Sequence, residues 1–239
     1  MHVGFFGGVF GVGLDRDGIE RLMRDHQIDN GVVFYPDNAY VAEVVESIPG
    51  LYALVWGNPR VPGYVEEVQR YLEHPKFIGL KLHPLIDGYL PNDTSVHPMV
   101  ELVLQRDQPI LIHCGHPIFS LPWSIEELAV SFPEAKIVIG HMGHGNAVYI
   151  QASIDIATRN ANVYLETSGM PMHTKIREAY ERAGETRVLF GTDVPFHHPL
   201  VEITKVRVSG LTDEAVERVL SKNGRLLFFG DEDAREPVR

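Results

Sequence analysis

Three apolar segments of this chain each end on a side chain that can bind a metal ion. The segments are Pro109–His113, Lys136–His141 and Arg187–Asp193, and they end on two imidazoles and one carboxylate. Each is rich in β-branched or aromatic residues and bounded by Gly or Pro, which is typical of a strand buried on both faces. In a parallel barrel the carboxyl ends of all strands open on one face, where catalytic groups collect. His113, His141 and Asp193 are therefore a candidate ligand set for a divalent metal such as zinc.

Composition narrows the class of protein. The chain has 239 residues, of which 44% are hydrophobic, and carries a net charge of −11 with its acidic residues scattered. That charge argues against nucleic acid and anionic membranes as partners, because both select basic patches. It leaves a small anionic substrate open, held by a local lysine or a metal. Cys114 is the one cysteine, so no intrachain disulfide can form, and we expect a cytoplasmic protein. No apolar run reaches the roughly 18 residues of a membrane span.

Strand-like stretches alternate with amphipathic helical stretches along the whole chain. This alternation predicts a parallel α/β fold. Even spacing and the absence of a Gly-rich dinucleotide turn favour a closed (β/α)8 TIM barrel, formed as a single domain by residues 1–239. We expect the segment His83–His97 to be a loop over the rim of the barrel. The predicted strands are His2–Phe6, Gly31–Tyr35, Leu51–Trp56, Phe77–Leu82, Pro109–Cys114, Lys136–Gly140, Asn162–Thr167 and Arg187–Gly191.

A set of short motifs resembles the amidohydrolase superfamily when taken in order. They are GLKLHP, PILIHCGHP, IVIGHMGHG, VYLETSG, VLFGTDVPF and NGRLLF. The closest branch is the amidohydrolase-related family, which contains hydrolases and metal-dependent decarboxylases such as aminocarboxymuconate semialdehyde decarboxylase. The resemblance implies a distorted (β/α)8 barrel with one divalent metal, usually zinc. By position, the implied ligands are His2, His113, His141 and Asp193.

The start of the chain departs from the family pattern. That pattern is Asp-x-His-x-His followed by an apolar residue and Gly, and His2-Val3-Gly4 fits its second half. The first histidine would directly precede Met1. Either the start has been assigned a few residues late, which truncates the first strand, or a ligand has been lost. We expect a late start, with His as the residue before Met1.

Further polar residues lie close to the predicted ligands. Lys81 and His83 are two apart on a predicted strand, so both face the same side. In some branches of the superfamily a lysine here is carboxylated and bridges two metals. The alternatives for Lys81 are binding a substrate carboxylate or a buried ion pair. His83 either contacts substrate or metal-bound water, or is a loop histidine before Pro84. His116 either shapes the substrate pocket or bonds the backbone.

Three alternatives at other strand ends stay open. His144, His197 and His198 follow the ligand candidates closely and could help to shape the pocket. Glu166 and Ser168 face opposite to Thr167, but the sequence does not decide which side points inward. Trp56 is more typical of packing than of substrate stacking.

The favoured function is metal-dependent hydrolysis, and the family resemblance implies a small amide, ester or lactone that carries a carboxylate as the substrate. A metal lowers the pKa of bound water. Asp193 would then take the proton of the water and pass it to the leaving group. His141 is either a strict ligand or stabilises the developing oxyanion. The alternatives are a non-oxidative decarboxylase on the same site and a non-catalytic barrel that has lost a ligand. A homodimer is possible.

Overall fold

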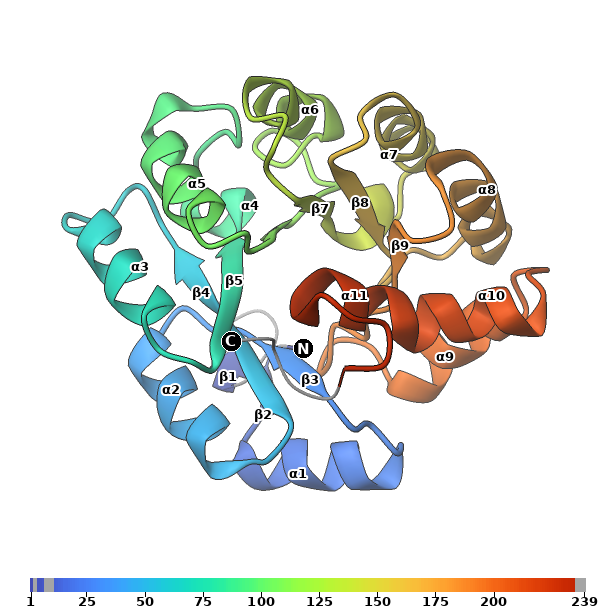
Figure 1. The fold of residues 1–239 in the computed structure, drawn as a ribbon, viewed down its shortest axis with the longest axis horizontal. Coiled ribbons are helices and arrows are strands. Elements are labelled where there is room, and N and C mark those ends of the chain that lie inside the picture. Colours follow the sequence, from blue (N-terminus) through green and yellow to red (C-terminus); the bar gives the residue numbers. More distant parts are fainter. Residues whose placement is uncertain (2–3, 7–10, 235–239) are drawn as a thin grey trace.

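The computed structural model describes Met1, Gly4–Phe6 and residues 11–234. Seven parallel strands form one curled sheet in the order β3-β4-β5-β6-β7-β8-β9, and helices surround it (Figure 1). The sheet strands are β3 Gly31–Val33, β4 Leu51–Gly57, β5 Phe77–Leu82, β6 Ile110–Ile112, β7 Ile137–Ile139, β8 Val163–Glu166 and β9 Val188–Leu189. The predicted TIM barrel is confirmed.

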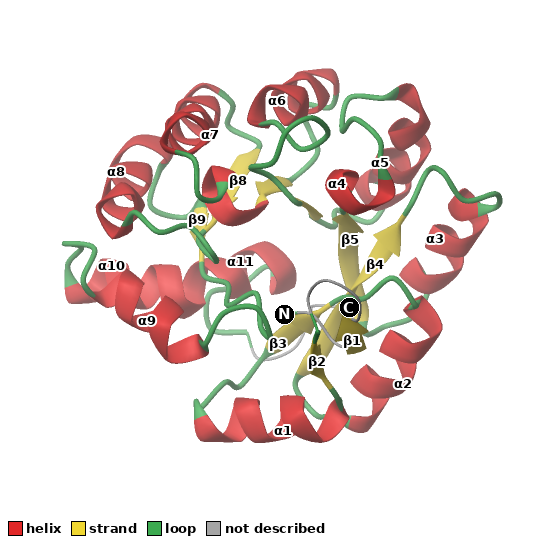
Figure 2. Cartoon of the chain, turned by 180° about the vertical axis from the view of Figure 1, so that it is seen from behind, coloured by secondary structure: helices red, strands yellow, loops and turns green. Residues whose placement is uncertain are grey.

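Helices follow the strands and lie on the outside of the sheet, as Figure 2 shows from the other side. No helix of the described ranges is both long enough and apolar enough to cross a bilayer. The segment predicted as a rim loop, His83–His97, contains α4 and a 3-10 turn at Thr94–Val96. The α-helices are α1 Arg16–Asp25, α2 Asn38–Ser47, α3 Tyr64–Leu72, α4 Pro84–Asp87, α5 His97–Leu104, α6 Pro122–Ser131, α7 Ala147–Arg159, α8 His173–Ala183, α9 Pro199–Arg207, α10 Asp213–Glu217 and α11 Asn223–Phe229.

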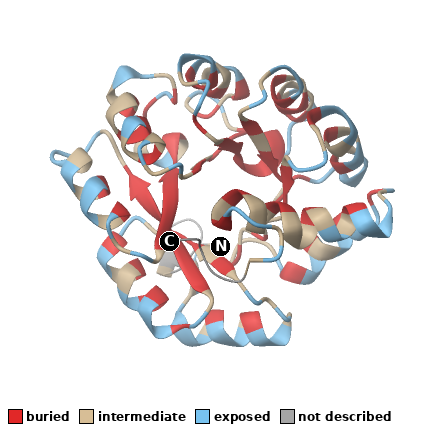
Figure 3. Cartoon of the chain, in the orientation of Figure 1, coloured by how far each residue is buried: buried red, intermediate tan, exposed pale blue. Residues whose placement is uncertain are grey.

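The strands are buried on both faces, which explains their continuous apolar sequences (Figure 3). All seven residues of β4 are buried. Leu51, Ala53 and Val55 belong to the core between strands and helices. The alternate residues Leu54 and Trp56 pack inside the barrel with side chains of β3 and β6. Two apolar layers, one on each side of the sheet, therefore stabilise each strand by burying apolar area.

A bulge in β5 sets which of its residues face the barrel interior. Ala53 pairs with Phe77 and Val55 pairs with Leu80, so β5 contains one residue more than β4 over this stretch. A Cβ added to Gly79 would lie 2.5 Å from the carbonyl oxygen of Pro109, so the bulge requires glycine. Beyond the bulge, Lys81 points into the barrel.

The prediction of a first parallel strand at His2–Phe6 was wrong for its described part. Gly4–Phe6 forms β1, which pairs antiparallel with β2 Val12–Leu14 in a separate two-stranded sheet. His2 itself lies outside the described residues. Gly4 has a φ of 98°, and a Cβ there would lie 2.9 Å from the ring of Tyr35. This left-handed, closely packed glycine directs the chain away from the barrel.

Met1 nevertheless lies in the place of a parallel neighbour of β3. Its nitrogen donates to the Val32 carbonyl at 2.9 Å, and its carbonyl accepts from the Phe34 nitrogen at 3.1 Å. Beside it, a cavity of about 460 Å³ lies between β3 and β9 and reaches the carboxyl ends of the strands.

Helix α11 closes the end of the barrel opposite these strand ends. Phe229 packs on Tyr52 and Ile78, and Leu227 packs on Val138 and Leu189. Apolar side chains therefore fill this end, and the polar inward residues are gathered at the other.

Candidate active site

His113 and His141 are brought together at the carboxyl ends of neighbouring strands. His113 directly follows β6, and His141 lies in the short turn Gly140–Gly143 after β7. The Nδ1 atom of His113 is 3.1 Å from the Nε2 atom of His141, and both side chains are buried. His141 has a φ of 62°, a left-handed conformation that costs about 1–3 kcal/mol and is frequent at functional sites.

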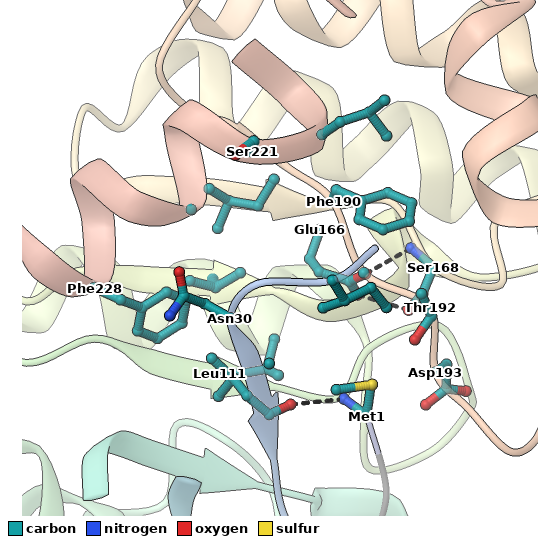
Figure 4. Close-up of a pocket in the computed structure, with 18 of the residues that line it drawn as sticks. Met1, Asn30, Leu111, Glu166, Ser168, Phe190, Thr192, Asp193, Ser221 and Phe228 are labelled. Carbon is teal, nitrogen blue, oxygen red and sulfur yellow. Dashed lines mark hydrogen bonds between the residues drawn. The ribbon is translucent and has the colours of Figure 1, made fainter. Parts of the chain in front are cut away.

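Asp193 follows β9 and lines the cavity, as Figure 4 shows. His141 lines the same cavity. Asp193 too has a left-handed backbone, with a φ of 49°. Within the described ranges, no group of three or more His, Cys, Asp or Glu side chains is close enough to hold a metal ion. His2, the fourth predicted ligand, lies outside those ranges. The donor types still fit a divalent ion, since imidazoles and carboxylates are common zinc ligands. His141 and Asp193 line one cavity, and His113 is adjacent to His141.

The histidines form a stacked cluster with Trp56. The ring centroids are 5.4 Å apart for Trp56 and His83, 4.0 Å for His83 and His113, and 5.1 Å for His113 and His116. His144 continues the cluster at 4.5 Å from His116. Trp56 therefore packs against the site rather than apart from it.

Burial disfavours the charged form of three of these imidazoles, those of His113, His116 and His144. It is the largest cause that lowers the pKa of His113 well below 6.5, followed by the neighbouring rings of His83 and His141. Burial likewise lowers the pKa of His116 and takes that of His144 to about 4. Neutral imidazoles carry a free lone pair, which metal binding requires.

His83 and His116 have structural partners as well as a place in the cluster. The Nδ1 atom of His83 accepts from the Ile86 nitrogen at 3.3 Å and caps α4. The Nδ1 atom of His116 is 3.0 Å from Nε2 of His113, and its backbone nitrogen donates to Ser120. His198 caps α9 by accepting from Leu200, while His197 lies against Gly169.

Lys81 is a buried cation that faces the cavity. Its Nζ atom lies 4.7 Å from the centroid of the Phe34 ring, and within the described part of the chain it makes no ion pair. Burial lowers its pKa from 10.5 to about 8, while the carboxylates of Asp193 and Glu166 oppose this shift. The cavity thus contains a cation that a substrate anion can pair with.

Asp87 is a second titratable group beside the cluster, and no motif in the sequence pointed to it. The indole nitrogen of Trp56 donates to its carboxylate at 3.0 Å. Burial raises the pKa of Asp87 from 3.8 to about 6, against the lowering effects of this hydrogen bond and of Lys81. Cys114, by contrast, is buried with a pKa raised to about 12, which makes it a poor nucleophile.

Glu166 and Ser168 point inward, which settles the facing left open by the sequence. Both line the cavity, and the hydroxyl of Ser168 donates to Glu166 at 2.8 Å. A Cβ on Gly191 would lie 1.9 Å from the Oε1 atom of Glu166. Gly191, two residues before Asp193, therefore makes room for the Glu166 side chain. Its lack of a side chain is the sequence feature that could have indicated the inward facing of Glu166, which strand alternation alone does not give.

Comparison with known proteins gives one family match and several similar folds. The model of a family described as amidohydrolase matches residues 13–229. Gamma-resorcylate decarboxylase from Polaromonas sp. (strain JS666 / ATCC BAA-500) is 24% identical, over 67% of this chain and 65% of the relative. The chain therefore spans about two thirds of the length of that relative.

Two solved structures share the fold. A dihydroxybenzoic acid decarboxylase from Polaromonas sp. JS666, with bound manganese and the inhibitor 2-nitroresorcinol, has a TM-score of 0.67 at 18% identity, covering 87% of this chain and 84% of that chain. A probable 2-pyrone-4,6-dicarboxylic acid hydrolase from Acinetobacter baumannii, with citric acid bound, has a TM-score of 0.72 at 15% identity, covering 95% and 96%.

Proposed function

Since this chain belongs to the amidohydrolase family, we propose that it is a metal-dependent decarboxylase of a small aromatic carboxylic acid. The observation that carries the proposal is that the buried cation Lys81, Asp193 and His141 all line one cavity. A relative and a solved structure of the same fold are named as decarboxylases of hydroxylated aromatic acids. These names favour decarboxylation, the alternative in the sequence analysis, over the hydrolysis that the sequence analysis favoured.

His113, His141 and Asp193 would hold the metal, with His2 as a further ligand. The donor set suits zinc, and manganese is bound in one structure of the same fold. When bound, the ion would supply a positive charge that orients an anionic substrate and stabilises negative charge near it.

The residues of this chain divide the remaining tasks. Lys81 would pair with an anionic group of the substrate, and Phe34, Leu111 and Phe190 would contact its ring, since all line the cavity. The bond between the ring carbon and the carboxyl group breaks, its electron pair stays on the ring carbon, and carbon dioxide leaves. Asp193 would deliver a proton taken up from solvent to that carbon. The balance is one carboxylate and one proton consumed, and one arene and one carbon dioxide formed.

Hydrolysis of a lactone is the second candidate. Its support is the Acinetobacter hydrolase, whose fold covers almost all of this chain. In that reaction a water molecule adds to the carbonyl carbon, Asp193 accepts its proton, and the same proton passes to the leaving oxygen.

Isotopes separate the two candidates. The protein loaded with manganese or zinc is incubated with carboxyl-13C gamma-resorcylate, and separately with 2-pyrone-4,6-dicarboxylate in H218O. The proposal expects 13CO2 in the headspace from the first, with at least a hundredfold loss in Asp193→Asn, because Asn cannot transfer the proton. Incorporation of 18O into the product of the second, without 13CO2 from the first, favours the hydrolase. Turnover no faster than in Asp193→Asn on either substrate contradicts both.

A further inference from the structure

The carboxyl end of β8 forms a buried polar cradle around His141. Figure 4 shows its residues Glu166 and Ser168 and the hydrogen bonds between them. Glu166 is the centre of this cradle and accepts three hydrogen bonds. Its Oε1 atom accepts from the Ser168 nitrogen at 2.7 Å. Its Oε2 atom accepts from the Ser168 hydroxyl at 2.8 Å and from the backbone nitrogen of His141 at 3.1 Å. One carboxylate thus contacts both the backbone of His141 and the hydroxyl beside its ring.

The direction of these hydrogen bonds fixes where the His141 ring carries its hydrogen. The Nδ1 atom of His141 is 3.0 Å from the Ser168 hydroxyl oxygen and 3.1 Å from the Ser168 carbonyl oxygen. The hydroxyl hydrogen is already donated to Glu166, and a carbonyl can only accept. Nδ1 must therefore carry the hydrogen, and in a neutral ring Nε2 then carries the lone pair.

We propose that Glu166 and Ser168 are positioning residues that hold His141 in its Nδ1–H tautomer, so that Nε2 is presented as a metal ligand. The hydrogen bonds between the histidine rings then follow from this tautomer. The lone pair on Nε2 of His141 accepts from Nδ1 of His113, and Nε2 of His113 accepts from Nδ1 of His116. The buried carboxylate of Glu166, acting through the Ser168 hydroxyl and together with the Ser168 carbonyl, thereby sets the tautomers of three histidines.

The cradle also supports the left-handed backbone of His141. A φ of 62° is unfavourable for a residue with a Cβ, and the hydrogen bond from its nitrogen to Glu166 offsets part of this cost. Glu166 can reach that nitrogen because the residue packed against its carboxylate is Gly191.

Helix α9 holds the cradle from outside the barrel. Glu202, which is 3% exposed, accepts from the Gly169 nitrogen at 3.3 Å. Lys205 donates to the Thr167 carbonyl at 2.7 Å and pairs with Glu202 at 2.5 Å. This buried ion pair clamps the backbone on both sides of Ser168, so the cradle is fixed before any ligand arrives.

The inference rests on the proposed metal site and decides between the two roles open to His141. In an Nδ1–H tautomer Nε2 carries the lone pair, so it can bind a metal in place of the hydrogen bond from His113, and it cannot donate a hydrogen bond to an oxyanion. Residues that orient metal-binding histidines typically change metal affinity by 10- to 100-fold when they are replaced.

Nitrogen-15 NMR of the histidine rings tests the inference in the metal-free protein, and zinc titration against a chelating dye tests it in the loaded one. Wild type should show His141 as the Nδ1–H tautomer. Glu166→Gln brings an amide that can donate to Ser168, which frees the hydroxyl to donate to Nδ1. It should therefore populate the Nε2–H tautomer and weaken zinc binding at least tenfold.

Two further variants make the test specific. Ser168→Thr keeps the hydroxyl and should retain the wild-type tautomer. Glu178→Gln removes a carboxylate from a polar network on α8 and should change neither readout. An Nε2–H tautomer in the wild type overturns the inference without any variant. Unchanged tautomer and zinc affinity in Glu166→Gln also overturn it. A wild type with the Nδ1–H tautomer that binds no zinc refutes the proposed metal site and leaves the positioning role standing.

Discussion

Each histidine of the stacked cluster whose pKa shifts does so in the same direction. Burial lowers the pKa of His113, His116 and His144, because the interior disfavours the charged imidazolium. These three imidazoles therefore stay neutral under conditions in which exposed histidines begin to protonate. This neutrality is what makes a group of close imidazoles compatible with binding a cation.

His144 gives a pH dependence with a definite sign. Its pKa falls from 6.5 in the unfolded chain to about 4 in the fold, so between these values the unfolded state binds more protons. The free energy of unfolding should therefore fall as the pH drops from 6.5 to 4. Urea midpoints measured at pH 7, 6, 5 and 4 should show a smaller decline in His144→Gln than in the wild type. His173→Gln, at an exposed position, is the control, and equal slopes in all three proteins would refute the shift.

We expect the fluorescence of Trp56 to change with pH because Asp87 ionises beside it. In a Trp123→Phe protein, Trp56 is the single tryptophan, and its indole donates to Asp87. Because burial raises the pKa of Asp87 to about 6, the emission of Trp56 should change with a midpoint near that pH. Asp87→Asn keeps a hydrogen-bond acceptor that does not titrate, so the change should be lost. A midpoint that survives in Asp87→Asn would assign the titration to another group, such as a histidine of the cluster.

Among the elements, the strands buried on both faces were predicted best from the sequence. Seven of the eight predicted strands are present in the parallel sheet, because continuous apolar runs bounded by Gly or Pro have no other stable place. The described part of the eighth pairs antiparallel with β2 instead. That outcome depends on the packing of Gly4 against Tyr35, a tertiary contact that no local pattern contains.

The sequence pattern did not predict helix α11, and the reason is physical. Its sequence Leu-Leu-Phe-Phe lacks an amphipathic period, since the helix closes the barrel and contacts apolar groups over several of its sides.

The alternation of side chains along a strand could not predict that Glu166 and Ser168 face the barrel interior. It gives the relative facing of residues on a strand, but the absolute facing requires the position of the strand in the barrel.

The closure by α11 should contribute strongly to stability. Phe229 is 4% exposed, and its ring centroid is 5.1 Å from that of Tyr52. Phe229→Ala should lower the free energy of unfolding by about 3–5 kcal/mol, through lost burial and a cavity. Val130→Ala removes an apolar group that is 63% exposed and should cost less than about 0.5 kcal/mol. Urea denaturation measures both, and similar losses in the two variants would show that α11 does not close a core.

In the whole molecule, the apolar packing that stabilises the barrel and the polar residues of the candidate site lie at opposite ends of the barrel axis. Apolar side chains of α11 fill one end, and the histidines, Asp193 and Lys81 are gathered toward the other. The chain has a net charge of −11, so the buried cation Lys81 is the local feature that would bind the anionic substrate of the proposed function. The family resemblance seen in the sequence is confirmed by the match over residues 13–229, whereas the cradle around His141 emerges only from the folded chain.

We propose that His113, His141 and Asp193 hold a catalytic divalent metal. Anomalous diffraction from crystals of the zinc-loaded protein, recorded on both sides of the zinc absorption edge, would locate that ion. We expect one strong peak at about 2.0–2.2 Å from nitrogen atoms of both histidines and from a carboxylate oxygen of Asp193. An active, zinc-loaded protein whose peak lies elsewhere, or is bound without His141 and Asp193, would contradict it.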